Sequence, residues 1–171
     1  MTAAAPGTTP AVRRAGRPGD LGAVAALHGV LYDREHGLDV RMEAVVAEGL
    51  GRFAQRHFAE GDAAGGLWVA ERRQTVLGSI GITREAADLA RLRWFLVSPE
   101  LRGAGVGSRL LDAALDWARG AGVARIYLLT FGDLRAAARR YVAAGFVRRG
   151  QRIGTEWSDT MVEERWELDL R

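Results

Sequence analysis

A glycine-rich turn between a strand pattern and a helix pattern constrains the fold of this chain most strongly. Residues 89–97 form a strand-like run that Ser98-Pro99 stops. Residues 102–107 then place three glycines within five positions. The turn leads directly into a helix pattern, ended by glycines at 120 and 122, whose apolar face is made by Val106, Leu110, Ala114 and Trp117. A strand–turn–helix connection of this kind is typical of an α/β protein.

The rest of the chain alternates between strand-like and helix-like spacing of its apolar residues. Further strands are predicted at 11–15, 67–71, 76–83, 124–130, 146–153 and 161–170, and further helices at 21–36, 42–53 and 134–142. Asp20 is the predicted N-cap of the first helix, and residues 61–66 are predicted to be a loop. The resulting order favours one α/β domain around a single mixed sheet. We expect residues 1–10 to be a disordered tail and residues 11–171 to form the domain.

The residue types that are missing exclude several chemistries. The chain has 171 residues and no cysteine, so disulfides, thiolate metal sites and a cysteine acyl-enzyme are excluded. It has no lysine either, which rules out a P-loop, because that motif requires one. His28, His36 and His57 lack the spacing of metal ligands, and we predict no metal.

Charge and hydropathy say less about partners. The net charge is +3 and the arginines are dispersed, so we predict no nucleic-acid partner, although the pI of about 10.1 keeps that alternative open. No segment approaches the roughly 20 apolar residues that span a membrane, and the N-terminus lacks a signal-peptide pattern. We therefore predict a cytoplasmic protein with no membrane partner.

The glycine-rich turn has the physical properties of a phosphate site. Glycines let the backbone approach a ligand closely, and the free N–H groups of the following helix attract an anion. Arg102 adds a fixed positive charge. The alternative is a simple connector, since short glycine motifs are weak signals. A dinucleotide fingerprint does not fit, because the glycines stand at 103, 105 and 107 rather than in G-x-G-x-x-G spacing.

Two motifs resemble the GNAT superfamily of N-acetyltransferases. Arg102, Gly105 and Gly107 are similar to its acyl-CoA loop, Arg-x-x-Gly-x-Gly, and the run Ala137-x-x-x-Tyr141-x-x-x-Gly145-Phe146 is similar to its second signature. The resemblance covers about residues 12–170. More narrowly, residues 28–37 and 166–170 resemble the acetyltransferase half of MarR–acetyltransferase fusion proteins.

The resemblance implies a single-domain GNAT fold that binds acetyl-CoA as co-substrate. Such a fold has a mixed, mostly antiparallel sheet of about seven strands, about four helices, and splayed fourth and fifth strands. The loop N–H groups would hold the pyrophosphate, and a main-chain N–H near Leu96 would polarise the thioester carbonyl. The cofactor-binding residues implied are Phe95, Leu96, Val97, Arg102, Gly103, Ala104, Gly105, Val106, Gly107, Ser108, Ala137 and Tyr141.

The same resemblance implies catalytic roles. Tyr141 matches the family's general acid, and we favour that role; the alternative is a core aromatic, because Tyr141 lies on the apolar stripe of its helix. Arg91 stands where many members carry a glutamate base, and Leu134 where they often carry asparagine. Glu164 is our candidate base, because it falls among apolar residues of the last strand. The alternative for Glu164 is a salt bridge.

The sequence constrains the identity of the acceptor substrate least. Substrate candidates are Tyr32, Glu35, Arg91, Arg93 and Trp157, each of which also reads as solvated surface. Glu35 would attract an amine, whereas the two arginines would bind a carboxylate. We expect acetyl transfer to a small-molecule or peptide primary amine by direct attack in a ternary complex, by a monomer or homodimer. The alternative is a non-catalytic acyl-CoA sensor.

Overall fold

The computed structural model describes residues 9–131, 134–154 and 158–170, and within the first turn of α4 the side chains of 135 and 136 are not described. The predicted tail is described only at residues 9 and 10, and Trp157 lies outside the described residues. The elements are β1 (Ala11–Arg14), α1 (Asp20–His36), α2 (Val40–Glu60), η1 (Gly61–Ala64), β2 (Gly65–Arg72), β3 (Thr75–Arg84), β4 (Leu89–Val97), η2 (Pro99–Leu101), α3 (Val106–Gly120), β5 (Arg125–Phe131), α4 (Arg135–Ala143), β6 (Val147–Ile153) and β7 (Val162–Asp169).

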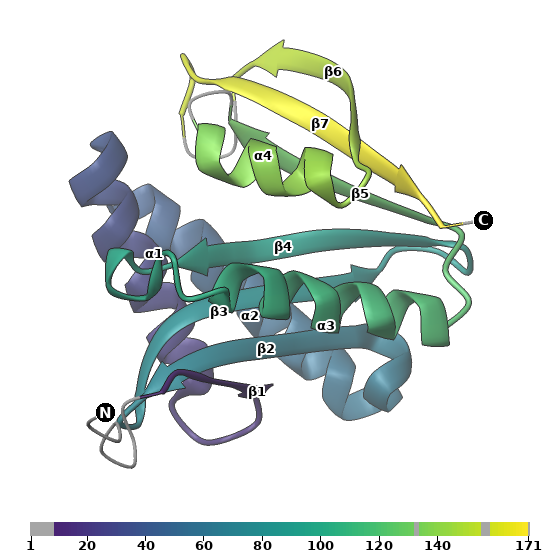
Figure 1. Cartoon of the computed structure of the whole chain (residues 1–171), viewed down its shortest axis with the longest axis horizontal. Helices are drawn as coiled ribbons and strands as arrows, with labels where there is room; N and C mark the ends of the chain where they lie inside the picture. Colours follow the sequence, from purple (N-terminus) through teal and green to yellow (C-terminus); the bar gives the residue numbers. More distant parts are fainter. Residues whose placement is uncertain (1–8, 132–133, 155–157, 171) are drawn as a thin grey trace, which may run out of the picture.

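Seven strands form one sheet in the order β1-β2-β3-β4-β5-β7-β6. Every neighbouring pair is antiparallel except β4 and β5, which are parallel. Helices α1 and α2 cover one face of β2–β4, and α3 crosses the other face, while α4 lies over β5 and β7 (Figure 1). The mixed sheet, the four α-helices and the single α/β domain confirm the predicted fold class.

The parallel pair β4 and β5 separates partway along its length. The ladder between them runs only from Leu89↔Arg125 to Leu92↔Leu128. Beyond that point β5 continues to pair with β7 as far as Phe131, while β4 runs on to Val97 alone on that side. The two strands diverge in Figure 1. The second half of β4 therefore offers unpaired main-chain groups along a gap in the sheet.

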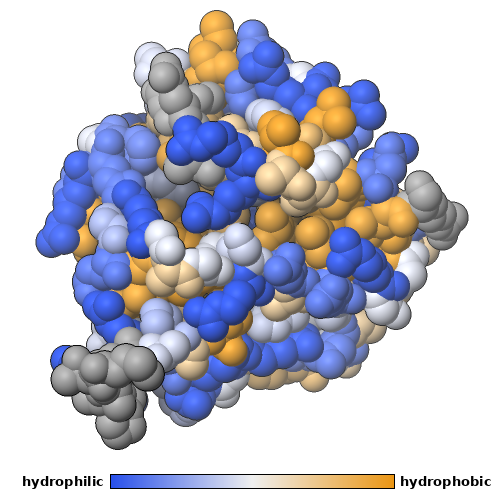
Figure 2. Space-filling model, viewed as in Figure 1, coloured by the Kyte–Doolittle hydropathy of each residue, from blue (hydrophilic) through white to orange (hydrophobic). Residues whose placement is uncertain are grey.

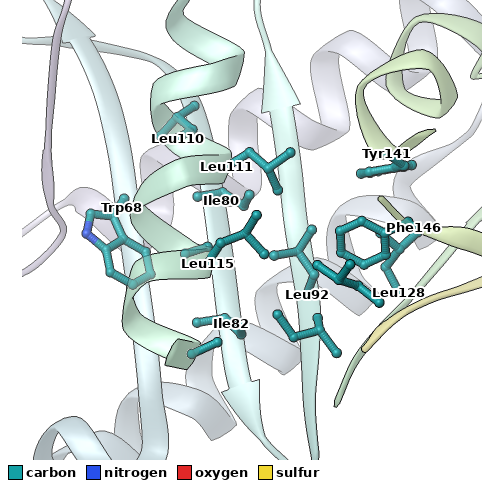
Figure 3. Close-up of a cluster of buried hydrophobic side chains, with 14 of the residues drawn as sticks. Trp68, Ile80, Ile82, Leu92, Leu110, Leu111, Leu115, Leu128, Tyr141 and Phe146 are labelled. Carbon is teal, nitrogen blue, oxygen red and sulfur yellow. The ribbon is translucent and has the colours of Figure 1, made fainter. Parts of the chain in front are cut away.

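Two apolar clusters hold the helices onto the sheet. The larger lies between α3, α4 and the sheet, where Figure 3 shows the leucines of α3 over Ile80 and Leu92, with Tyr141 and Phe146 beyond Leu92. The smaller lies under α1 and α2 and includes Leu50 and Trp94. On the outer surface of the α3–α4 face, hydrophilic residues predominate, with hydrophobic ones between them (Figure 2). No helix in the described part of the chain is long and apolar enough to cross a membrane.

Two local predictions were wrong. Asp20 does not cap α1, since Gly19 occupies the N-cap position and makes no side-chain cap. The Asp20 carboxylate instead accepts hydrogen bonds from Arg13 (2.8 and 2.9 Å) and from the backbone N–H groups of Gly16 and Arg17 (2.8 and 2.9 Å). It therefore ties β1 to the start of α1. The predicted 61–66 loop is a short 3₁₀ turn followed directly by β2.

Candidate active site

The glycine-rich turn adopts a conformation that only glycine takes readily. Gly103 has a φ of 82° and Gly105 a φ of 71°, both in the left-handed region. Gly105 is also the N-cap residue of α3, with no side-chain cap on the helix's first N–H groups. A Cβ added at either glycine would meet nothing within 4 Å. The turn thus presents the uncapped, positive end of a 15-residue helix to open space.

A cavity lies beside this turn, and we call it the outer cavity. Its volume is about 460 Å³, and it is lined by Tyr32, Glu35, His36, Phe95, Leu96, Val97, Arg102, Leu134, Ala137, Arg139 and Arg140. Five of the predicted cofactor-binding residues therefore line this cavity. Arg102 belongs to the turn, and Phe95, Leu96, Val97 and Ala137 lie outside it. The unpaired stretch of β4 forms one wall.

Two arginines of α4 add positive charge that the sequence reasoning did not assign. Arg139 and Arg140 line the outer cavity with Arg102. The Arg140 side chain lies against the turn, because a Cβ placed on Gly107 would fall 2.7 Å from its Nε atom. In the sequence, the two consecutive arginines directly before Tyr141 could have indicated this positive charge. Three guanidinium groups and a helix N-terminus suit a polyphosphate.

Glu35 is bound to the turn instead of standing free to attract an amine. Its two carboxylate oxygens accept hydrogen bonds from Arg102 Nη2 at 2.7 and 2.9 Å. Arg102 Nε also donates to the carbonyl oxygen of Val97 (3.3 Å). The end of α1 is thereby ion-paired to the turn across the outer cavity, and the Glu35 side chain is 29% exposed.

A bulge in β4 lies at the point where β4 and β5 part. Trp94 has a φ of 50°, which is costly for a bulky residue. The β3–β4 register shifts here, from Gly81↔Arg93 to Ser79↔Leu96. The buried Ser79 hydroxyl donates to the carbonyl oxygen of Trp94 (2.7 Å) and holds the distortion. The main chain after Trp94 is thus displaced from a regular ladder, directly beside the gap.

A second, deeper cavity meets the outer one and extends across the gap. We call it the inner cavity. Its volume is about 90 Å³, and it is lined by His28, Tyr32, Met42, Val45, Val46, Arg91, Leu92, Arg93, Trp94, Phe95, Leu128, Leu129, Thr130, Phe131, Leu134 and Tyr141. Tyr32, Phe95 and Leu134 line both cavities. The two spaces therefore adjoin where β4 and β5 separate.

Tyr141 lines the inner cavity beside Phe95, which lines both cavities, and belongs to an aromatic cluster. It is 5% exposed, and its ring centroid lies 6.0 Å from that of Phe95, 5.8 Å from Phe146 and 6.3 Å from Trp166. Burial raises the pKa of its phenol well above the usual range, so the hydroxyl remains protonated at neutral pH. The two readings from the sequence, core aromatic and proton donor, are compatible in this position.

Glu164 is engaged elsewhere. One carboxylate oxygen accepts from Arg148 Nη1 (2.8 Å) and the other from Trp166 Nε1 (3.0 Å). Glu164 lines neither the inner nor the outer cavity. This position argues against the role of general base and agrees with the alternative of a salt bridge. That role nevertheless stays a prediction for experiment.

The basic side chains among the described lining of the inner cavity are Arg91 and Arg93 of β4 and His28 of α1. Arg91 Nε is buried without a hydrogen-bond partner among the described residues. Arg93 stacks on the Trp94 ring, 4.7 Å from its centroid, and reaches α2 at Gly49. His28 is buried and its Nδ1 lies 2.8 Å from the carbonyl oxygen of Val24. The sequence reasoning named both arginines but gave His28 no role.

The remaining predicted residues occupy the glycine-rich turn and the first turn of α3. Val106 and Gly107 are buried in the first turn, Ala104 and Ser108 are exposed, and none of the four lines either cavity. Among the described residues no group of three or more His, Cys, Asp or Glu side chains is arranged to hold a metal ion.

Comparison with known proteins identifies this arrangement. The profile of the Acetyltransferase (GNAT) family matches residues 31–146, about two thirds of the chain. The chain belongs to the GNAT family of acetyltransferases. A GNAT relative in Escherichia coli (strain K12), the uncharacterized N-acetyltransferase YjgM, is 32% identical over 116 residues, covering 66% of this chain and 68% of that protein.

Solved structures share the fold. An acetyltransferase from Streptococcus agalactiae superposes with a TM-score of 0.76 at 21% identity, covering 94% of this chain and 98% of that one. The structure of yncA from Salmonella typhimurium with its cofactor acetyl-CoA has a TM-score of 0.74 at 17% identity, covering 96% and 95%. At these identities the likeness establishes the GNAT fold. The narrower resemblance to MarR fusion proteins stays a prediction.

Proposed function

We propose that this GNAT protein transfers the acetyl group of acetyl-CoA to the nitrogen of a primary amine, by direct attack within a ternary complex. The observation that carries the proposal is the pair of adjoining cavities at the split between β4 and β5. One is rich in anion-binding groups and the other is small and deep. Tyr32, Phe95 and Leu134 line both cavities, so two substrates can meet where the cavities adjoin, next to Tyr141 in the lining of the inner cavity.

The outer cavity fits the cofactor's chemistry. The first N–H groups of α3, with Arg102, Arg139 and Arg140, would hold the pyrophosphate. The open edge of β4 would pair with the amides of the pantetheine arm as an added strand does. That arm leads to the bulge at Trp94, where displaced main chain is available to hydrogen-bond the thioester carbonyl.

The transfer then needs one bond made, one broken and two protons moved. The neutral amine attacks the thioester carbon, the carbon–sulfur bond breaks, and the electron pair leaves with sulfur. Tyr141, which lines the inner cavity, donates its hydroxyl proton to the departing thiolate and takes a proton back from solvent. The described lining of the inner cavity contains no carboxylate, so we assign the proton lost by nitrogen to water.

A sensor that binds acyl-CoA without turnover is the second candidate, favoured by that same lack of a carboxylate base. Release of CoA thiol, measured across a panel of primary amines, separates the two. We expect release that requires the amine, an acetylated product by mass spectrometry, and intersecting initial-rate lines when both substrates are varied. Acetyl-CoA binding without any amine-dependent release would contradict the proposal in favour of the sensor, and parallel lines would contradict direct attack.

A further inference from the structure

The inner cavity has a basic lining group that is not matched by an acid of the same lining. Arg91 lines it from β4, and no aspartate or glutamate is among its described lining residues. A substrate whose only charge is an ammonium group would be repelled by the Arg91 guanidinium group at short range. An acceptor that brings its own anion would be attracted instead.

The surroundings of Arg91 leave part of its guanidinium available. Its group lies 5.8 Å from the ring centroid of Tyr127, and its Nε has no hydrogen-bond partner among the described residues. Two carboxylates on neighbouring segments have other hydrogen-bond partners: Glu167 of β7 accepts from Arg165 Nε (2.7 Å), and Glu85, directly after β3, accepts from the Thr83 hydroxyl (2.7 Å). A buried donor without a partner is costly, and a ligand oxygen would satisfy it.

His28 supplies a hydrogen-bond acceptor, whereas Arg91 supplies a donor. A carbonyl oxygen only accepts, so the contact with Val24 places the hydrogen on Nδ1 and leaves the lone pair on Nε2. That Nε2 is buried, has no partner among the described residues, and belongs to a side chain that lines the cavity. Burial lowers the pKa of His28 to about 4, so the ring is neutral at physiological pH and accepts from an N–H group.

We propose that the acceptor is a small molecule of the amino-acid class, with a carboxylate that binds Arg91 and an amine that donates a hydrogen bond to His28 Nε2. This inference rests on the proposed function and narrows its substrate. Arg91 comes from β4 and His28 from α1, and both line one cavity of about 90 Å³, which favours a single small amino acid over a polymer. The carboxylate fixes orientation, and the amine nitrogen is thereby directed to the junction with the outer cavity.

The test compares matched acceptors. Each standard amino acid is assayed for CoA thiol release beside its decarboxylated amine and its methyl ester, which keep the amine and remove the negative charge. We expect the best amino acid to exceed its two uncharged counterparts by at least about 10-fold in kcat/KM, the effect of one charge-assisted hydrogen-bonded pair. Equal or better turnover of the decarboxylated amines would overturn the inference while leaving the acetyltransferase function intact.

Variants of single arginines test which side chain recognises the carboxylate of the acceptor. Arg91→Met keeps the length of the side chain and removes the guanidinium; it should raise KM for the amino acid about 10- to 100-fold and change KM for the decarboxylated amine less than about threefold. Arg125→Met is the matched control, because Arg125 is on the neighbouring strand, outside the cavity, and pairs with Asp169 on the surface (2.8 Å). Equal effects of Arg91→Met on both acceptors would overturn the carboxylate role.

Binding provides a readout that does not depend on turnover. Calorimetry of the best amino acid into the protein saturated with CoA should show affinity that Arg91→Met weakens and Arg125→Met leaves unchanged. Absence of amino-acid binding to a protein that binds CoA would overturn this inference alone. Failure to bind acetyl-CoA or CoA at all would instead overturn the proposed function on which the inference depends.

Discussion

Tyr141 is buried and lines the inner cavity, and its hydroxyl can be removed with little change in packing. We expect Tyr141→Phe to lower kcat by roughly 10- to 10⁴-fold, because the thiolate would leave without its proton donor. Affinity for acetyl-CoA, measured by calorimetry, should change little, since the ring and its contacts with Phe95 and Phe146 remain. A variant with full turnover would show that Tyr141 is only a core residue.

His28 makes stability depend on pH. Its pKa is about 4 in the folded protein against about 6.5 in the unfolded chain, so between these values the unfolded chain binds a proton that the folded state excludes. The free energy of unfolding should therefore fall as pH decreases from 6.5 to 4, by up to about 3 kcal/mol from this residue. Urea titrations at several pH values should show that His28→Phe lacks this component. Parallel pH dependences of both proteins would contradict the assignment.

Glu164 tests the source of the proton acceptor. Because its oxygens are held by Arg148 and Trp166, we expect Glu164→Gln to leave the shape of the pH–rate profile unchanged. The rate should rise through the alkaline range, following the free amine. Loss of an ionisation near neutrality in the variant would restore Glu164 as the base.

At the scale of elements, the spacing of apolar residues and the placement of glycines predicted nearly every helix and strand, because each of these elements buries one regular face. Asp20 was misassigned because Asp-before-helix is a capping signature, whereas Arg13 lies seven positions earlier and competes for the carboxylate. The bulge at Trp94 could not be predicted, because a positive φ on tryptophan has no sequence signal and depends on Ser79 from another strand. The ion pair between Glu35 and Arg102 could not be predicted either, because the two residues are 67 positions apart in the sequence.

The contact between α1 and the turn should oppose cofactor binding. An incoming pyrophosphate would compete with Glu35 for Arg102 and be repelled by the same carboxylate. We expect Glu35→Gln to tighten acetyl-CoA binding several-fold, with a smaller gain at high salt. Glu48→Gln on α2 removes an exposed pair with Arg52 far from the turn and is the control. Weaker binding in Glu35→Gln would show that Glu35 positions Arg102 instead of competing for it.

At the scale of the whole molecule, cofactor binding is assigned to the glycine turn before α3, which the sequence predicted and which lies beside the outer cavity. Gly105 and Gly122 lie at the two ends of that helix with nearly the same φ, 71° and 70°, and a Cβ at either meets nothing within 4 Å. A glutamate at each position therefore imposes the same backbone strain. Only the one at 105 places a negative charge where we assign the pyrophosphate.

Calorimetric titration of acetyl-CoA into Gly105→Glu and Gly122→Glu tests that assignment most directly. Both variants should fold, with similar losses of thermal stability relative to the wild-type protein. We expect Gly105→Glu to weaken acetyl-CoA binding by at least about 100-fold, through clash and repulsion of like charges, and Gly122→Glu to bind as the wild-type protein does. Equal affinities in the two variants would contradict the assignment of the cofactor to this turn.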